Sequence, residues 1–225
     1  WQTVLVVVGL PGLVLALLMF TIKEPERKGV SANRTEGYSY RELWQFCLSR
    51  RKYLTYHFVA YLCLSIQGFA FLTWIVEFFV RIHGWTRTEI GLTYGSIALI
   101  VGIMGSIGAG YYAGYWLAKG RADAPMRLAF YGTIGLGPLA VIMPLVSSDW
   151  RAIALIIPIT FFMAMPPGLS NAALQAISPN RMRGQMIAVY LICVSFLSYL
   201  FAPLIIGLMN DYVFGREDAI GLSLA

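Results

Sequence analysis

Six long apolar runs, separated by polar segments, set the main constraint on how this 225-residue chain can fold. A helix that crosses a bilayer needs about 20 mostly apolar residues, and each run meets that length. The runs are too long, and alternate too little, for membrane β-strands. The sequence therefore predicts an all-α, polytopic membrane protein with six transmembrane helices, and residues 219–225 open a seventh. The runs cover approximately residues 2–22, 54–80, 89–118, 127–147, 152–177 and 186–209.

Composition supports the membrane assignment and narrows the possible chemistry. Hydrophobic residues make up 58% of the chain and charged residues only 12%, against about 25% charged residues in soluble domains. The three cysteines lack C-x-x-C spacing, and there are only two histidines. No strand–turn–helix dinucleotide motif or P-loop is present. We expect no metal, no cofactor and no enzymatic activity. The net charge of +6 comes from Lys and Arg residues in the loops, so we do not take it as a sign of a nucleic-acid partner.

The charged residues divide the chain and orient it in the membrane. Segments 23–53, 119–127 and 178–185 hold thirteen of the seventeen Lys and Arg residues. Membrane proteins concentrate these residues in cytoplasmic loops, so we expect all three segments on the cytoplasmic side. Residues 23–53 form the only long polar stretch and end in an amphipathic part, which is typical of a helix on the membrane surface. We therefore expect one helix over 1–22, a linker over 23–53 and a helical bundle over 54–225.

The turns and the third run carry local signals. Thr86 and Glu89 fit a capping box at the start of the third run, and Asp149 is a candidate N-cap for the fifth. Small residues recur at helical spacing through the third run. Such a stripe lets another helix approach closely, and it also suits helices that slide during gating. The stripe comprises Gly91, Gly95, Ala98, Gly102, Gly105, Ala109 and Ala113.

The fifth run contains an interruption near its middle. Pro166 and Pro167 remove two backbone donors from a helix that lies in the bilayer. The carbonyls that lose their partners then need other donors. Interrupted helices at the midplane point to transport sites, so Pro166, Pro167 and Asn171 are candidate cavity residues. A proline kink filled by ordinary packing is the alternative.

The second run offers polar and charged candidates. Gln67 lies at its centre and shares a helix face with Phe71 and Trp74, so these three residues either line a binding cavity or form an interhelical contact. Glu77 and Arg81 have the spacing of a helix-face ion pair near the outer surface. Glu77 is also a candidate proton carrier, because ionisable groups in membranes are often functional.

His57 follows a basic segment at the start of the same run. We interpret it as a surface residue at the inner membrane interface.

Several motifs resemble the second half of a major facilitator superfamily transporter, most closely the spinster-like and related bacterial transporters. They are Gly9-x-Pro11-Gly12, Glu24-Pro25, Trp74, Arg81, His83-Gly84-Trp85, Gly91 and Gln175-x-x-x-Pro179-x-x-x-Arg183-Gly184. On this alignment the runs are helices six to eleven of twelve. The family's loop motif normally has an acid after Leu-Ala. Here Lys119 follows Ala118, and Asp123 comes four residues later.

The resemblance implies a secondary active transporter that works by alternating access. The solute, a small organic or amphiphilic molecule, would lie near the midplane between two six-helix bundles, and helices seven and ten would line its cavity. Glu77, Arg81 and Arg183 become candidates for coupling or gating, with proton coupling left open. The implied partners are the solute, the bilayer and the N-terminal helical half, and the implied location is the inner or plasma membrane. A membrane sensor or scaffold that keeps the fold without transporting is the alternative.

The charge asymmetry predicts which loops a membrane-impermeant reagent can reach. In a cysteine-free background, Ser148→Cys should react with a maleimide added outside the cell, because it lies in a loop poor in Lys and Arg. Ala122→Cys should be protected until the membrane is permeabilised. The reverse labelling pattern would show that the orientation is inverted.

Overall fold

The computed structural model describes residues 2–23, 39–215 and 220–224, and these belong to two units that we describe separately. The first unit contains α1 (Gln2–Met19), an apolar helix with Pro11 inside it. The second unit begins at Gly37 and holds the remaining helices. Among the described residues, six helical segments are long and apolar enough to cross a membrane, as the sequence predicts. None of these residues forms a β-strand.

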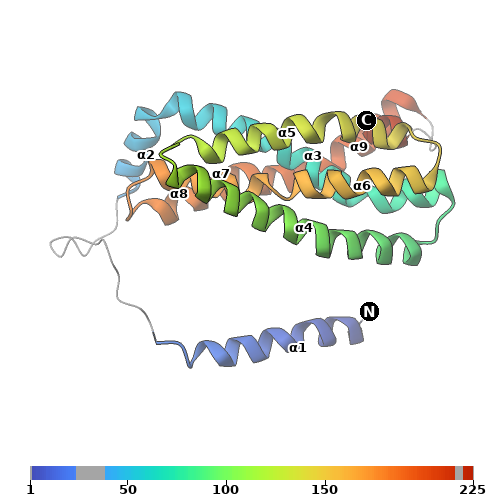
Figure 1. Cartoon of the computed structure of the whole chain (residues 1–225), viewed down its shortest axis with the longest axis horizontal. Coiled ribbons are helices and arrows are strands. Elements are labelled where there is room, and N and C mark those ends of the chain that lie inside the picture. Colours follow the sequence, from blue (N-terminus) through green and yellow to red (C-terminus); the bar gives the residue numbers. More distant parts are fainter. Residues whose placement is uncertain (1, 24–38, 216–219, 225) are drawn as a thin grey trace. The chain divides into compact units, whose positions relative to one another are not determined.

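The second unit is a bundle of five membrane-length segments that run back and forth (Figure 1). They are α3 (Arg51–His83), α4 (Arg87–Ala118), α5 (Ala124–Ile142) with the 3₁₀ turn η1 (Met143–Leu145), α6 (Asp149–Met163) with α7 (Pro166–Ile177), and α8 (Arg183–Tyr190) with α9 (Leu197–Leu208). Two π-helical segments, η2 (Leu191–Phe196) and η3 (Met209–Phe214), precede and follow α9. The short α10 (Ile220–Leu224) comes last.

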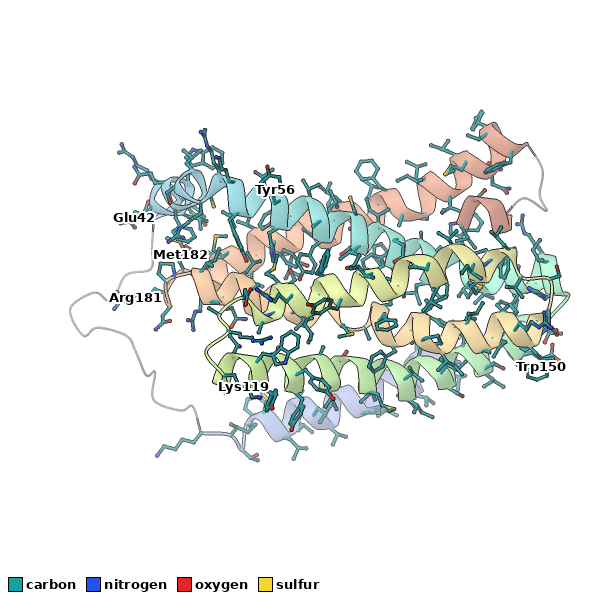
Figure 2. The ribbon with its side chains drawn as sticks, turned by 45° about the horizontal axis from the view of Figure 1, so that its top comes forward. Glu42, Tyr56, Lys119, Trp150, Arg181 and Met182 are labelled. Atoms are coloured by element: carbon teal, nitrogen blue, oxygen red, sulfur yellow. The ribbon has the colours of Figure 1, made fainter. Side chains whose placement is uncertain are left out.

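The bundle has two ends, which we name from their turns. The inner end carries α2 (Tyr40–Ser49) and the turns over 119–123 and 178–182, and the outer end carries the turns over 84–86 and 146–148. Figure 2 shows Glu42, Lys119 and Arg181 at one end of the bundle and Trp150 at the other. The segments that are rich in Lys and Arg therefore meet at a single end, as an oriented membrane protein requires.

Helix α2 is amphipathic, as the sequence of this region suggests. Ser39 caps it, and Glu42 completes the capping box by accepting from the Ser39 N–H at 2.8 Å. Leu43 is buried, and the Cys47 Sγ lies 3.9 Å from the Met186 Sδ of α8. Trp44 remains exposed on the described unit. One side of α2 thus packs on the bundle and leaves an apolar surface free for lipid.

At the outer turns, one of the two predicted helix caps is confirmed and the other is wrong. Thr86 and Glu89 form the expected capping box, and α3 ends at Gly84, whose φ of 70° favours glycine. Asp149 is not the N-cap of α6, because that position belongs to Ser148. The Asp149 carboxylate, one position into the helix, accepts a hydrogen bond from the Trp85 indole at 3.2 Å.

Part of the small-residue stripe of α4 packs against α6, whereas a Cβ added at Gly91 or Gly95 would meet nothing within 4 Å. A Cβ added at Gly105 would overlap the Phe161 carbonyl oxygen and lie 3.2 Å from the Cβ of Ala164. Since the overlapping atom belongs to the backbone, a rotamer change cannot relieve the contact. Gly105 therefore allows the close approach, in agreement with the packing interpretation of the stripe.

Gly105→Ala should lower the thermal midpoint of the protein, with a destabilisation of about 1–3 kcal/mol typical of overpacking. Gly102→Ala is the matched control, because a Cβ there would meet the Thr160 Cγ2 at an ordinary 4.0 Å. Both changes improve helix propensity equally, so the difference between the two midpoints isolates the close contact. Equal midpoints would contradict this role for Gly105.

Candidate functional site

The fifth membrane segment breaks where the sequence predicts an interruption. Helix α6 ends at Met163 and α7 begins at Pro166, and the two residues between them are not α-helical. The Met165 N–H bonds to the Phe162 carbonyl at 3.3 Å, which tightens the last turn. Pro166 and Pro167 have no N–H to donate, so the regular ladder cannot continue across them.

A neighbouring helix supplies a donor at this break. The Ser106 hydroxyl of α4 donates a hydrogen bond to the Ala164 carbonyl at 3.1 Å. Ser106 directly follows Gly105, so the same close approach of α4 makes this bond possible. A side-chain donor thereby meets the requirement that a carbonyl in the bilayer has a partner.

A cavity of about 320 Å³ lies beside the break. Helix α3 forms one wall and α7 another, and α8 with η2 contributes Tyr190, Leu191 and Ser195. Leu191 and Ser195 belong to the π-helical turn η2, and such turns often occur at functional sites. The lining is largely apolar, and its polar groups come from Tyr61, Ser65, Asn171, Tyr190 and Ser195.

The predicted cavity residues divide between two places. Pro166, Pro167 and Asn171 line the 320 Å³ cavity, which we call the α7 cavity. Gln67 and Phe71 line a second cavity of about 270 Å³ that also involves α9 and Leu224 of α10. The helix face that the sequence groups together thus points away from Asn171.

Three of these side chains have polar atoms without a partner among the described residues. The Asn171 Oδ1, the Gln67 Oε1 and the Trp74 Nε1 are all buried. Trp74 packs in the core, and its ring would lie 3.9 Å from a Cβ added at Gly207. Asn171 is therefore the amide in the α7 cavity with an acceptor left for a ligand, because a buried carbonyl oxygen without a donor is costly.

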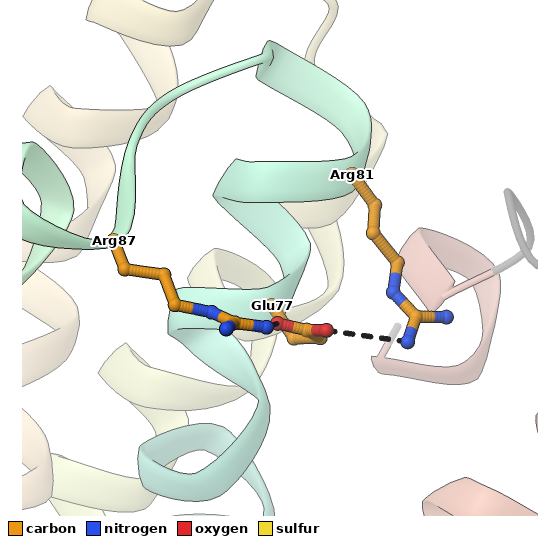
Figure 3. A network of polar contacts seen from close by, with 3 residues as sticks. All are labelled: Glu77, Arg81 and Arg87. Carbon is orange, nitrogen blue, oxygen red and sulfur yellow. Dashed lines mark hydrogen bonds and ion pairs between the residues drawn. The ribbon is translucent and has the colours of Figure 1, made fainter.

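The outer end contains the predicted ion pair of Glu77. Figure 3 shows the Glu77 carboxylate between two guanidinium groups, Arg81 at 3.2 Å and Arg87 at 3.4 Å. Arg81 lies one turn further along α3, whereas Arg87 begins α4, so the carboxylate joins the two helices across their turn. The Arg87 side chain is 75% exposed, and exposed pairs contribute less than about 1 kcal/mol each.

The inner end holds Arg183 and the altered loop motif. The Arg183 Nε donates to the Gln175 carbonyl at 3.1 Å, which connects the start of α8 to the last turn of α7. In the loop motif, the Lys119 ammonium lies 4.3 Å from the centroid of the Tyr115 ring. Asp123 pairs with Arg127, and the hydrogen bond from this guanidinium lowers the pKa of the Asp123 carboxyl.

His57 is not a surface residue, contrary to the interpretation from sequence. Only 1% of it is exposed, and its Nε2 lies 3.0 Å from the Oγ of Ser170 on α7. The basic residues before it suggested an interface, but α7 and α8 cover this face of α3. The spacing of Tyr53, His57 and Tyr61 on one helix face was the available signal, since a shared aromatic face predicts burial.

Comparison with known proteins agrees with this architecture. The family model of the Major Facilitator Superfamily matches residues 1–203. The chain belongs to this superfamily. A structure described as a bacterial homologue of the human lysosomal transporter Spinster, inward-facing and unoccupied, aligns with a TM-score of 0.67 at 19% identity. The alignment covers 96% of this chain and 45% of that chain. No curated protein sequence matches significantly.

The superfamily match confirms the family resemblance and the helical membrane fold. It identifies the five-segment bundle as a major facilitator bundle that spans less than half of the aligned transporter. At 19% identity the structural likeness concerns the fold, so the roles of individual residues rest on their surroundings in this chain.

Ser106→Ala should lower the thermal midpoint, because it leaves the Ala164 carbonyl without its donor. A hydrogen bond between membrane helices contributes about 0.6 kcal/mol on average and up to about 2 kcal/mol. Ser96→Ala on the same helix is the matched control, since the Ser96 hydroxyl bonds to Leu92 within α4. If Ser96→Ala lowered the midpoint as much as Ser106→Ala, the bond to the break would have no particular importance.

Proposed function

We propose that the protein is a secondary active transporter that moves a small organic or amphiphilic solute by alternating access across the inner or plasma membrane. The observation that carries the proposal is the α7 cavity beside an interrupted membrane helix. Interrupted helices with a cavity at the same depth are typical of transporter binding sites. Membership of the superfamily supports transport without covalent chemistry.

The lining of the α7 cavity favours an amphiphilic solute. Leucines of α3 and Met163 supply apolar contacts, while Asn171 and two serines supply neutral polar ones. No acidic or basic side chain is among its lining residues in the described part of the chain. A bare ion would need charged groups or many oxygens around it, whereas an apolar body with a small polar head fits this surface.

Alternating access requires an element with two arrangements, and α7 is the best candidate. It is separated from α6 by the break, where Ser106 of α4 donates to the Ala164 carbonyl, and it connects to α8 through Arg183. A half-helix of 12 residues can tilt about such a break while α6 stays packed. The opposite wall of the transport pathway would come from the N-terminal half of the transporter, as in other proteins built from two repeats.

Uptake into proteoliposomes tests the proposal with the complete transporter, using a fluorescent single-chain amphiphile as the probe. We expect saturable uptake, and we expect Asn171→Leu to weaken the apparent affinity about tenfold to a hundredfold, as the loss of a buried hydrogen bond of ~1–3 kcal/mol implies. Gln67→Leu is the matched control, because it removes an amide from the neighbouring cavity instead.

The outcomes separate the alternatives. Equal losses of affinity in both variants would show that the α7 cavity is not the specific binding site. A loss confined to Gln67→Leu would indicate that the solute binds in the second cavity. Absence of saturable uptake over a panel of amphiphiles and organic acids would favour the sensor or scaffold.

A further inference from the structure

The inner half of the bundle contains a buried histidine that contacts the half-helix α7. His57 lies on α3 and its Nε2 meets the Ser170 hydroxyl, which is itself fully buried. Ser170 follows Pro166 by one helical turn, so this contact joins α3 to α7 just beyond the break. Because the hydroxyl can donate or accept, either neutral tautomer of the imidazole can form the bond.

The second ring nitrogen of His57 has no such partner. The Nδ1 is buried and forms no hydrogen bond with any of the described residues. The groups that face the ring are aromatic: Tyr53, Phe58 and Tyr61 from α3, and Tyr190 from α8. Of these, only the tyrosines are titratable, and no carboxylate or cationic side chain forms a hydrogen bond or ion pair with the imidazole in the described part of the chain.

This environment differs from that of the carboxylates and the second histidine towards the outer end. Glu77, Glu89 and Asp149 lie towards the outer end, and each carboxylate accepts from a nearby donor. His83 also lies at the outer end, where its ring meets Phe78 edge-on and is tilted against Phe79. His57 is a base on the inner side of the break, in direct contact with the half-helix that lines the cavity.

The ring of His57 is also connected to the α7 cavity. The rings of Tyr61 and Tyr190 lie 4.6 and 6.1 Å from the imidazole, centroid to centroid, and both tyrosines line the cavity. A change in the packing around His57 therefore changes a wall of the cavity directly. The two tyrosine rings thus link the imidazole to the cavity lining.

We infer that His57 is a proton-binding site whose protonation releases α7 from α3, an inference that rests on the proposed transport function. A proton from water adds to the lone pair of the neutral ring and produces an imidazolium with two N–H donors. In the packed arrangement Ser170 can accept from one of them, while the Nδ1–H has no acceptor. The charged ring is stable only where water or another acceptor reaches it, so proton binding favours the arrangement in which α7 has moved.

A cysteine on the buried face of α7 reports this movement without any solute. Ala173 is 5% exposed, so Ala173→Cys should be protected while α7 is packed. The experiment uses the complete transporter in proteoliposomes, with all native cysteines replaced by alanine. N-ethylmaleimide labelling is measured from pH 8 to pH 5 and normalised at each pH to the same protein unfolded in detergent, which removes the titration of the thiol itself.

We expect normalised labelling to rise on the order of tenfold towards pH 5, because a tenfold difference in proton affinity between two states shifts their ratio by that factor. His57→Phe keeps an aromatic ring and should abolish the rise. His83→Phe, the matched control at the outer end, should leave it intact. His57→Gln provides a second neutral side chain, able to bond with Ser170, if the phenylalanine variant does not fold.

The inference is overturned if labelling does not depend on pH in the unaltered protein, or if the dependence survives both His57 substitutions. It is also overturned if His83→Phe removes the dependence as completely as His57→Phe does. Labelling needs no transported solute, so failure of the uptake experiment leaves this result intact. Saturable uptake together with pH-independent labelling would reject the role of His57 while retaining the transporter.

Discussion

Two missing backbone donors in the middle of a membrane segment organise the inner half of this bundle. Pro166 and Pro167 cannot continue the hydrogen-bond ladder of α6, and hydrocarbon offers no water to replace it. The break therefore has to lie against protein, and α4 provides that protein surface. Gly105 allows the two backbones to approach, and Ser106 donates to the Ala164 carbonyl. The close packing of α4 on α6 and the break that precedes α7 therefore lie at the same place in the bundle.

The two larger buried clusters of the bundle lie towards opposite ends, on either side of the break. Towards the outer end, a cluster that includes Ile75, Phe78, Phe79 and Ile156 is fully buried. Towards the inner end, the buried cluster runs from α2 through α3 and α7 to α8. The α7 cavity adjoins the boundary between them, with lining residues from both sides. A fully buried outer cluster next to an interrupted inner region suits a protein in which one half-helix moves while the rest stays packed.

Three polar groups of the inner region involve α7 directly. Arg183 binds the carbonyl of Gln175 at the end of α7, Ser170 meets His57, and Asn171 presents an unpartnered oxygen at the cavity. At the outer end, Glu77 joins α3 to α4 through exposed arginines. A polar contact inside the bundle contributes more to stability than an exposed one at its end, because its groups are shielded from water. The position of the half-helix α7 therefore depends strongly on its buried polar contacts.

Sequence reasoning succeeded where the deciding factor was local. Run length predicted the six membrane segments, Thr86 and Glu89 predicted a capping box, and the two prolines predicted the break. It failed for His57, because neighbouring charges along the chain say nothing about which helices cover a given face. The assignment of Asp149 as a cap was wrong by one position, because the helix begins with Ser148 as its N-cap, and the Asp149 carboxylate binds the Trp85 indole, which is distant in sequence.

The sequence by itself determined that the chain crosses a membrane. It also determined which of the loops lie at the same end of the bundle and where a helix must break. Each of these follows from hydropathy, charge or missing donors within a few adjacent residues. Only the tertiary structure decided that Gln67 and Asn171 line different cavities, that η2 brings Ser195 to the larger one and that His57 meets Ser170. The physical reason is that these contacts depend on the rotation and tilt of packed helices, which side-chain packing across the whole bundle sets.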